Sequence, residues 1–539
     1  MFKSRKSIYI PAAAVMCAVI ISSCGGGKDQ KGGRSLSAEE LKTAEYPLKT
    51  DDTLTLWMRH HVGAQVSGFP DYSKYPRLAE MEKQTGIKLD ITYADNGQEE
   101  EEFNMLIASG DLPDMIYYDW MNITGGVDEA IRSGYITALN DLLADYAPNY
   151  RDFLNKKPEY AKMARTDSGN YYMFNGYPEK DQDDVNAVDR TVTCGFVLRK
   201  DWLDELGLEA PETIDEWHYV LTEIKQKKGI EGPLVLNFSD EYAYQDLIGA
   251  FGTIPGFYQE DGKVVYGRVQ PQYRSFLEEM HKWYREGLLD EAVMSTSDDI
   301  ATKKMIDGSS GACFSWVGAG IEKWLNEGKK LSSEYDLIGV KPPTLNKGET
   351  SKFGNYFLAF NHMGVAISAA SDKKELAAKF MDYGYSDKGA ILCNYGIEGV
   401  SYEMKDGVPT YKMPPEGMTR TDFLTLNSFA TGSWPYKVLT NENEYFYSLP
   451  QQFQAVDEFK KTEYYNYIMP PITHTVDEAE EVSRLERLTS DYANEMMKKF
   501  ILGKEPLDNF DAYVERLKQL GIDRLTELKQ NALQRYNRR

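Results

Sequence analysis

Short apolar segments alternate with amphipathic segments in the first part of the chain. The apolar ones have the length and the β-branched or aromatic content of strands, whereas the others carry apolar residues three and four positions apart and are followed by glycine, as helices often are. The predicted order is strand, helix, strand, helix, strand, over Thr53–Met58, Pro76–Thr85, Ile87–Tyr93, Glu99–Ser109 and Asp114–Trp120. This order predicts a parallel sheet, whose ligands bind outside the carboxyl ends of the strands.

A second series of strands and helices follows, and the chain ends in a largely helical region. Thr213 and Glu216 form a capping-box pattern at the start of one of the helices. The predicted strands are Thr191–Leu198, Leu234–Phe238, Ala312–Trp316 and Tyr335–Val340, with one or two more in Gly354–Ser368, and the clearest helices are Ile214–Lys227, Pro271–Glu286, Asp372–Tyr383 and Val476–Phe500.

The first residues of the chain have the pattern of an export signal. Lys3, Arg5 and Lys6 precede an apolar run, Ser7–Ile21, that is short for a transmembrane helix. The following Ile21-Ser22-Ser23-Cys24 resembles the lipobox of bacterial lipoproteins, which implies lipidation of Cys24 after removal of residues 1–23. Residues 24–50 are polar and aperiodic, which indicates a flexible tether. The alternative is an ordinary signal peptide, cleaved at small residues, in which Cys24 has no role.

Charge and length narrow the range of functions. The chain has 539 residues and a net charge of −23, which argues against nucleic acid or an anionic bilayer as the ligand of the folded part. After the leader, no apolar run approaches the length of a membrane span. The lipid on Cys24 is therefore the only membrane anchor that we predict, and a chain of this length favours two or more lobes.

The sequence predicts neither a metal site nor a cofactor. Three cysteines remain beyond Cys24, namely Cys194, Cys313 and Cys393, and no pair has CxxC spacing. Buried free thiols are the favoured interpretation, with one disulfide as the alternative. His60 and His61 would point to opposite faces of a strand, so they make a poor metal site.

Several stretches, in order, resemble one family. They include TGIKLDITY, FNMLIASGDLPDMIYYDW, GFVLRKDWLDELGLEAPETIDEW, DGSSGACFSWVGAG and KKELAAKFMDYGYSDKGAILCNYGIEGV. This succession is similar to the extracellular solute-binding proteins of sugar ABC importers, including maltose-binding protein. The resemblance implies an α/β, two-lobe periplasmic-binding-protein-like fold (class II type). Each lobe would be a mostly parallel sheet flanked by helices, with a hinge between the lobes and a helical C-terminal part.

The resemblance also implies where the chain passes between lobes. Lobe 1 would comprise residues 51–170 and 355–395, and lobe 2 residues 171–354 and 396–539. The crossing segments would lie near 171–190 and 341–354. A ligand would bind in a cleft between the lobes, and the protein would not be an enzyme. As a monomer it would capture an oligosaccharide by hinge closure and deliver it to the membrane permease subunits of an ABC importer.

Sugars need flat aromatic surfaces for their C–H faces and polar groups for their hydroxyls. Trp316, after the strand ACFS, matches a position where sugar-binding relatives place a stacking tryptophan; it could instead be a core residue. The other candidates follow strands or lie in Gly-flanked turns. They are Arg59, His60, Asp119, Trp120, Asn237, Tyr242, Tyr244, Tyr395, Glu398 and Trp434. Their alternatives are a solvated loop for Arg59 and His60, a loop or helix cap for Asp119, Tyr395 and Glu398, and core packing for Trp120 and Trp434.

Two rival functions remain open at this point. A secreted glycoside hydrolase would use two carboxylates in a similar cleft, although no nucleophile elbow, HExxH or Walker A motif is present. A sugar-sensing surface receptor without an importer would have the same fold and the same binding residues.

Overall fold

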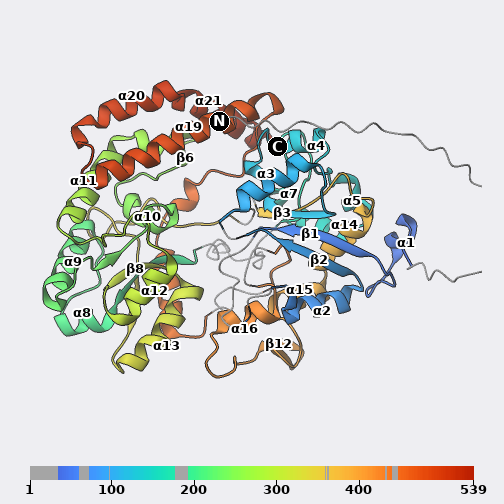
Figure 1. The fold of residues 1–539 in the computed structure, drawn as a ribbon, viewed down its shortest axis with the longest axis horizontal. Helices are drawn as coiled ribbons and strands as arrows, with labels where there is room; N and C mark the ends of the chain where they lie inside the picture. The colour runs from blue at the N-terminus through green and yellow to red at the C-terminus, as the bar shows by residue number, and fades with distance from the viewer. Residues whose placement is uncertain are drawn as a thin grey trace, which may run out of the picture.

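The structure is a computed structural model that describes residues 34–59, 69, 72–95, 97–175, 192–358, 360, 363–430, 434–439 and 447–539. It has the two-lobe α/β periplasmic-binding-protein fold. Figure 1 shows lobe 1, with the blue and cyan strands β1–β3, beside lobe 2, which is mainly green and yellow. The leader, Cys24 and residues 25–33 of the predicted tether lie outside the described residues, as does most of the first crossing segment. The prediction of a flexible tether as far as residue 50 is wrong, because Ala38–Thr43 form helix α1 and the side chains of Leu41 and Leu48 are buried in the same core cluster as Leu54 of β1.

Lobe 1 contains a four-stranded sheet in the order β10-β3-β1-β2. Strands β1 (Thr53–Met58), β2 (Lys88–Tyr93) and β3 (Met115–Asp119) are parallel to one another, as the strand and helix order predicts. The fourth strand, β10 (Met363–Ile367), is antiparallel to β3, with Met363 opposite Asp119. Because β10 follows the second crossing, it starts at the edge where β1 and β3 end.

Lobe 2 contains a mixed sheet in the order β5-β8-β4-β9. Strand β4 (Cys194–Arg199) is antiparallel to both β8 (Ala312–Trp316) and β9 (Leu337–Val340), whereas β5 (Leu234–Val235) is parallel to β8. The predicted mostly parallel sheet is therefore wrong for this lobe. The reason is that β4 arrives from the first crossing and runs away from lobe 1, so Cys194 pairs with Trp316 at the opposite end of β8.

Two hairpins and twenty α-helices of the described residues complete the fold. The hairpins are β6–β7 (Phe257–Glu260, Lys263–Tyr266) and β11–β12 (Tyr402–Lys405, Val408–Tyr411). The helices before the second crossing are α1 (Ala38–Thr43), α2 (Pro76–Thr85), α3 (Glu99–Ser109), α4 (Val127–Arg132), α5 (Asn140–Asp145), α6 (Pro148–Asn155), α7 (Pro158–Met163), α8 (Lys200–Leu206), α9 (Ile214–Lys228), α10 (Glu241–Gly249), α11 (Pro271–Arg285), α12 (Asp298–Asp307) and α13 (Glu322–Leu331). Those after it are α14 (Lys374–Tyr383), α15 (Asp387–Tyr395), α16 (Arg420–Asn427), α18 (Pro450–Phe459), α19 (Val476–Ile501), α20 (Phe510–Leu520) and α21 (Ile522–Arg538).

Described residues of the segments 396–430 and 434–439 pack with lobe 1, although the resemblance assigned these segments to lobe 2. The buried side chains of Phe429 and Tyr436 belong to the same core cluster as Leu54 and Leu56 of β1. Helix α16 lies against α2, where Arg77 donates from Nη1 to the carbonyl oxygen of Ser428 at 2.9 Å. Among the described residues, the part from residue 447 onward packs with lobe 2, where α18 lies against β9.

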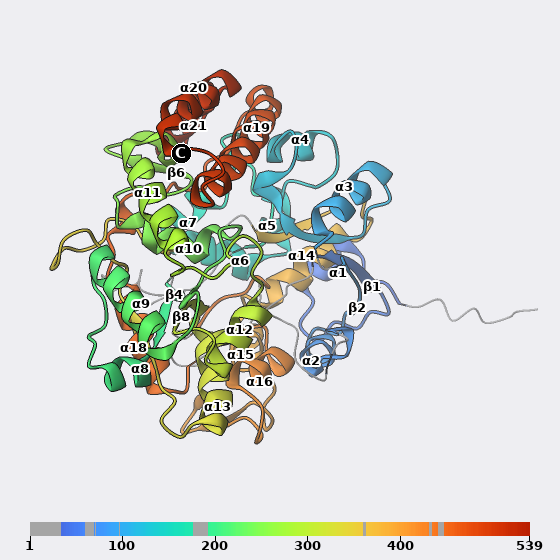
Figure 2. The same ribbon diagram turned by 60° about the vertical axis from the view of Figure 1, so that its left-hand side comes forward.

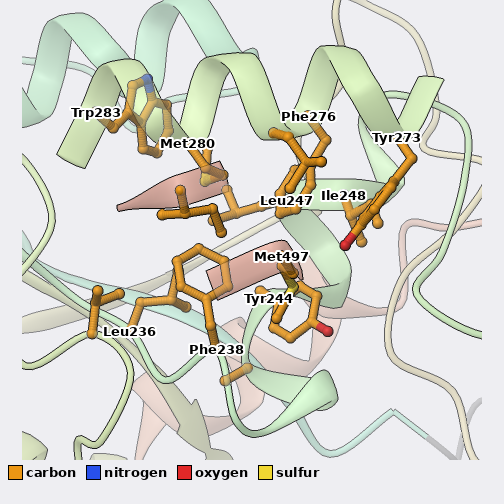
Figure 3. Close-up of a cluster of buried hydrophobic side chains, with 14 of the residues drawn as sticks. Leu236, Phe238, Tyr244, Leu247, Ile248, Tyr273, Phe276, Met280, Trp283 and Met497 are labelled. Atoms are coloured by element: carbon orange, nitrogen blue, oxygen red, sulfur yellow. The ribbon is translucent and has the colours of Figure 1, made fainter. Parts of the chain in front are cut away.

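The C-terminal helices enlarge the core of lobe 2. Side chains of α19, α20 and α21 share one hydrophobic cluster with α9, α10 and α11. Figure 3 shows Met497 of α19 in this cluster with Leu247 of α10 and Met280 of α11. Among the described residues, none of the helices is long and apolar enough to cross a membrane.

The three cysteines beyond the leader are buried free thiols, as favoured by their apolar sequence contexts. Burial raises the pKa of Cys313 and of Cys393 well above the usual thiol range. Low thiolate content makes both groups unreactive at neutral pH.

Candidate functional site

The strand ends of both lobes meet the crossing segments. In lobe 1, β3 ends at Asp119 beside the start of β10, and in lobe 2, β8 ends at Trp316 beside the start of β4. The second crossing runs from β9 to β10 and carries Phe357. Residues at these positions are therefore placed where the two lobes adjoin.

Three aromatic side chains gather at this junction, and we call them the interlobe aromatic group: Tyr242, Trp316 and Phe357. The ring centroids of Trp316 and Phe357 are 5.6 Å apart with planes inclined by 31°. Tyr242 lies 5.1 Å from Phe357 and 5.9 Å from Trp316. Trp316 is 36% exposed and Tyr242 is 41% exposed, whereas large aromatic side chains are mostly buried in folded proteins. The group therefore presents aromatic surface to solvent.

Three elements hold these rings. Trp316 is the last residue of β8, directly before the π-helical turn Val317–Ile321. Tyr242 lies in the first turn of α10, whose N-cap residue is Asp240. The Asp240 carboxylate accepts a hydrogen bond from the backbone N–H of Tyr242 at 3.0 Å. This capping contact is the type that favours aspartate before a helix. Phe357 comes from the crossing segment itself.

The electrostatic environment of Tyr242 keeps its hydroxyl protonated. Burial, followed by the nearby Cys194 and the negative charges of Asp240, Glu241 and Asp119, raises the pKa of Tyr242 to about 12. Asp119 belongs to lobe 1, so its influence crosses between the lobes. A protonated phenol can donate a hydrogen bond to a ligand oxygen, and the carboxylates can accept hydrogen bonds from ligand hydroxyls.

On the lobe 1 side, the structure describes Arg59 and Asp119 of the predicted contacts. The backbone N–H of Arg59 donates to the carbonyl oxygen of Tyr117 at 3.4 Å, and its Nη1 lies 3.7 Å from Sδ of Met363. Both residues are half-buried at the carboxyl ends of β1 and β3. His60 lies outside the described residues.

Trp120, Tyr244 and Trp434 are placed in the core rather than at the junction. Trp120 is 0% exposed and packs edge-on against Phe103. Tyr244 is also 0% exposed, and Figure 3 shows it inside the lobe 2 cluster near Met497. Trp434 packs between Phe380 and Phe429 in lobe 1. Their rings offer no accessible face, so we leave them out of the site.

The remaining candidates cap turns or lie on other surfaces. The side-chain oxygen of Asn237 accepts a hydrogen bond from the backbone N–H of Ser239 at 2.9 Å, in the turn after β5. Tyr395 is buried and stacks on Tyr411 of the β11–β12 hairpin, with centroids 4.5 Å apart. Glu398 is exposed in the turn that follows α15.

The junction is identified by its rings and not by a cavity. Two depressions lined by described residues lie elsewhere in lobe 1: one of about 610 Å³ beside α3 and one of about 340 Å³ between Tyr46 and α15. Neither includes a residue of the interlobe aromatic group. Within the described part of the chain, no group of His, Cys, Asp and Glu side chains has the arrangement of a metal site.

Comparison with known proteins supports the two-lobe interpretation. The family model described as bacterial extracellular solute-binding protein matches residues 67–391. The chain belongs to this family. It is 23% identical, over 99% of its length and 98% of the relative, to the fructooligosaccharide ABC transporter substrate-binding protein FusA of Streptococcus pneumoniae. It is 25% identical to the lipoprotein LipO of Bacillus subtilis, over 62% of this chain and 66% of LipO.

Solved structures share the fold over nearly the whole chain. The alginate-binding protein AlgQ2, in a structure without calcium ion, matches 91% of this chain and 100% of that chain, with a TM-score of 0.75 and 23% identity. FusA in complex with kestose matches 90% of this chain and 99% of that chain, with a TM-score of 0.71 and 22% identity. At these identities the likeness establishes the fold alone.

Proposed function

We propose that this solute-binding protein is the substrate-binding component of a carbohydrate ABC importer and binds an oligosaccharide between its lobes. The observation that supports this most directly is the interlobe aromatic group, with two rings more than one-third exposed where the lobes adjoin. Flat rings beside carboxylates match the two surfaces of a sugar ring, its C–H face and its hydroxyl rim.

The names of related proteins support the same ligand class. FusA is named for fructooligosaccharide, and other proteins of this fold are an alginate-binding protein and an N-glycan transport solute-binding protein. These ligands differ in charge and in linkage, so the relatives support a carbohydrate and leave the particular sugar to experiment.

The mechanism that follows is capture by closure of the lobes. In this mechanism Trp316 and Tyr242 stack on the sugar from lobe 2, while Asp119 and Arg59 bind hydroxyls from lobe 1. Phe357, on the crossing segment, stays near the ligand in both states. Only contacts that improve in the closed state shift the equilibrium towards closure, so the lobe 1 contacts drive it. The closed form then docks on the permease subunits.

Membrane attachment through Cys24 completes the proposal. Two acyl chains on this residue would anchor the protein stably to the extracytoplasmic face, where a single chain would be marginal. The name of LipO, which is a lipoprotein, supports this. Tethering raises the effective concentration of a monomer near its permease.

A thermal-shift panel of purified oligosaccharides, with kestose and a uronic acid oligomer among them, tests the ligand class. A ligand that binds only the folded state raises the melting temperature. For a ligand found this way, Trp316→Ala should weaken affinity at least about tenfold, because truncating a central aromatic residue typically costs more than about 1.4 kcal/mol. Tyr219→Ala, at an exposed position of α9, and Trp120→Phe should leave affinity within about twofold of the wild type.

Outcomes against the proposal are equally clear. A shift with peptides or polyamines and none with any sugar would replace the carbohydrate assignment. Cleavage of a bound oligosaccharide would favour the hydrolase, which membership of a solute-binding family disfavours. Normal sugar uptake in cells lacking the gene would favour the receptor without an importer.

A further inference from the structure

The second crossing segment is attached to α10 by three side chains. The backbone N–H of Asn355 donates to Oδ1 of Asp246 at 3.1 Å, and Nδ2 of Asn355 donates to the same oxygen at 3.2 Å. The same Nδ2 lies 3.1 Å from the carbonyl oxygen of Tyr242. The residue before Asp246 in α10, Gln245, donates from Nε2 to the carbonyl oxygen of Gly354 at 2.7 Å.

These contacts adjoin the interlobe aromatic group through the backbone of Tyr242. Asn355 touches the backbone of Tyr242 and is two residues from Phe357, so it is connected to two of the three rings. The approach of the two segments is close, because a Cβ atom on Gly249 of α10 would meet the carbonyl oxygen of Phe353 at 2.7 Å. The crossing segment therefore belongs rigidly to lobe 2 as far as Asn355.

This attachment buries polar groups at a cost in folding free energy that a purely structural contact would not require. Asp246 and Asn355 are each 1% exposed, and burying a carboxylate without a cation is unfavourable. Among the described residues, Oδ1 of Asn355 also has no hydrogen-bond partner. Local conflicts of this kind concentrate where function requires a defined geometry.

We propose that Asp246 and Asn355 are positioning residues: they fix Tyr242 and Phe357 at the spacing that Trp316 needs to form one sugar-binding surface. The inference rests on the proposed function, since the surface matters only if the rings bind the ligand. Neither side chain contacts the ligand itself. Without the Asn355 side-chain amide, the link from the crossing segment to the carbonyl oxygen of Tyr242 is lost, and the rings lose their common arrangement.

The first experiment measures the arrangement of the three rings in the absence of a ligand. The near-ultraviolet circular dichroism of the wild type minus that of Trp316→Phe isolates the band that depends on Trp316 and its aromatic neighbours. We expect Asn355→Ala and Asp246→Ala, each compared with its own Trp316→Phe double variant, to lose at least half of this band. Asp246→Asn keeps an oxygen that can accept both hydrogen bonds from Asn355, so it should retain the band.

The second experiment measures kestose binding by calorimetry, or binding of the first oligosaccharide that shifts the wild-type melting temperature. Asn355→Ala should bind at least about tenfold more weakly, and Asp246→Asn within about threefold of the wild type. Tyr335→Phe is the matched control, because it removes a buried hydrogen bond of lobe 2, from the hydroxyl to the carbonyl oxygen of Met305, that involves neither α10 nor the crossing segment. It should lower stability without changing the band or the affinity.

The results separate the two proposals. Asn355→Ala that behaves like Tyr335→Phe in both the band and the affinity would overturn the positioning role. A Trp316→Ala variant with undiminished sugar affinity would overturn the proposed site, while loss of the band in Asn355→Ala would still confirm that this residue sets the ring arrangement.

Discussion

Arg539 donates a hydrogen bond from Nε to Oδ1 of Asp167 across 2.8 Å, and the two residues belong to opposite lobes. Arg535 donates to the other oxygen of the same carboxylate at 2.6 Å. The side chains of Arg539 and Asp167 are only 4% and 10% exposed. The C-terminal helices, at the top of Figure 1, therefore join lobe 2 to lobe 1 close to the first crossing segment.

The first prediction concerns this junction. Asp167→Ala leaves two guanidinium groups without their shared carboxylate, and breaking a buried pair by removing one partner costs about 3 kcal/mol. We expect that loss in the free energy of unfolding, measured in urea by circular dichroism. Arg538→Ala, at an exposed neighbouring position, is the control and should change it by less than about 0.5 kcal/mol. A loss below about 1 kcal/mol for Asp167→Ala would mean that the network is no more stabilising than a surface ion pair.

A second interlobe contact predicts the rate of ligand release. The carboxylate of Glu322, in lobe 2, accepts hydrogen bonds from the backbone N–H of Arg420 at 3.2 and 3.3 Å, and so caps helix α16 of lobe 1. Figures 1 and 2 both show α16 near α13. A negative charge at a helix N-terminus contributes up to about 1 kcal/mol, so Glu322→Gln should speed dissociation of the oligosaccharide about fivefold.

Stopped-flow fluorescence checks this rate. Glu334→Gln, at an exposed position of the same lobe, is the control and should leave dissociation unchanged. The contact stabilises the closed state only if association is nearly unaffected in Glu322→Gln. An equal change in both rates would contradict the assignment, because closure follows binding.

The third prediction is a pH dependence of stability. Burial raises the pKa of Asp246 from 3.8 to about 7, although the backbone and side-chain N–H groups of Asn355 oppose the shift. The folded state therefore binds a proton that the unfolded state releases. This contribution to stability is fully present below pH 3.8 and is lost as the pH rises through about 7.

Calorimetry of Asp246→Asn measures this effect. Because one pKa unit corresponds to about 1.4 kcal/mol, the ionised form should cost the wild type roughly 4 kcal/mol at pH 8. The variant should gain stability relative to the wild type between pH 5 and pH 8. Asp508→Asn, whose carboxylate is almost fully exposed, should show no such trend. A constant difference across this range would show that Asp246 does not titrate there.

The fourth prediction concerns attachment of the protein to the membrane through Cys24. Cys24→Ser removes the thiol that the lipobox would present for lipidation, so the protein should appear in the culture medium instead of the membrane fraction. Its sugar affinity in solution should equal that of the wild type, whereas sugar uptake by cells should fall, because tethering raises the effective concentration at the permease. Retention in the membrane fraction would contradict lipidation at this residue.

Local pattern was sufficient to predict many elements. The strands Thr53–Met58 and Ala312–Trp316 and the helices Pro76–Thr85 and Glu99–Ser109 have the bounds expected from the sequence. Each is limited by residues that act nearby, such as Gly86 and Gly110, which adopt the left-handed backbone conformation that ends a helix. Strand direction in lobe 2 was missed because it depends on where the crossing delivers the chain.

Long-range packing explains the other errors. Leu426 packs with Tyr72 and Tyr75, more than three hundred positions away, and nothing near Leu426 reveals that lobe 1 is its partner. At the site, Tyr242 and Tyr244 are two positions apart on α10 and so point in different directions, which the helical period could have shown. Phe357 had no signal of its own, because its role depends on the crossing segment meeting α10.

Lobe 1 is assembled from two separated parts of the chain, and this affects the order in which the protein matures. Strand β3 has no partner on one side until β10 is made, and the lobe core lacks Phe429 and Tyr436 until later still. An unpaired strand edge invites association with other chains. During export, the early part of the chain must therefore remain protected from aggregation until residue 439 has emerged from the translocation channel.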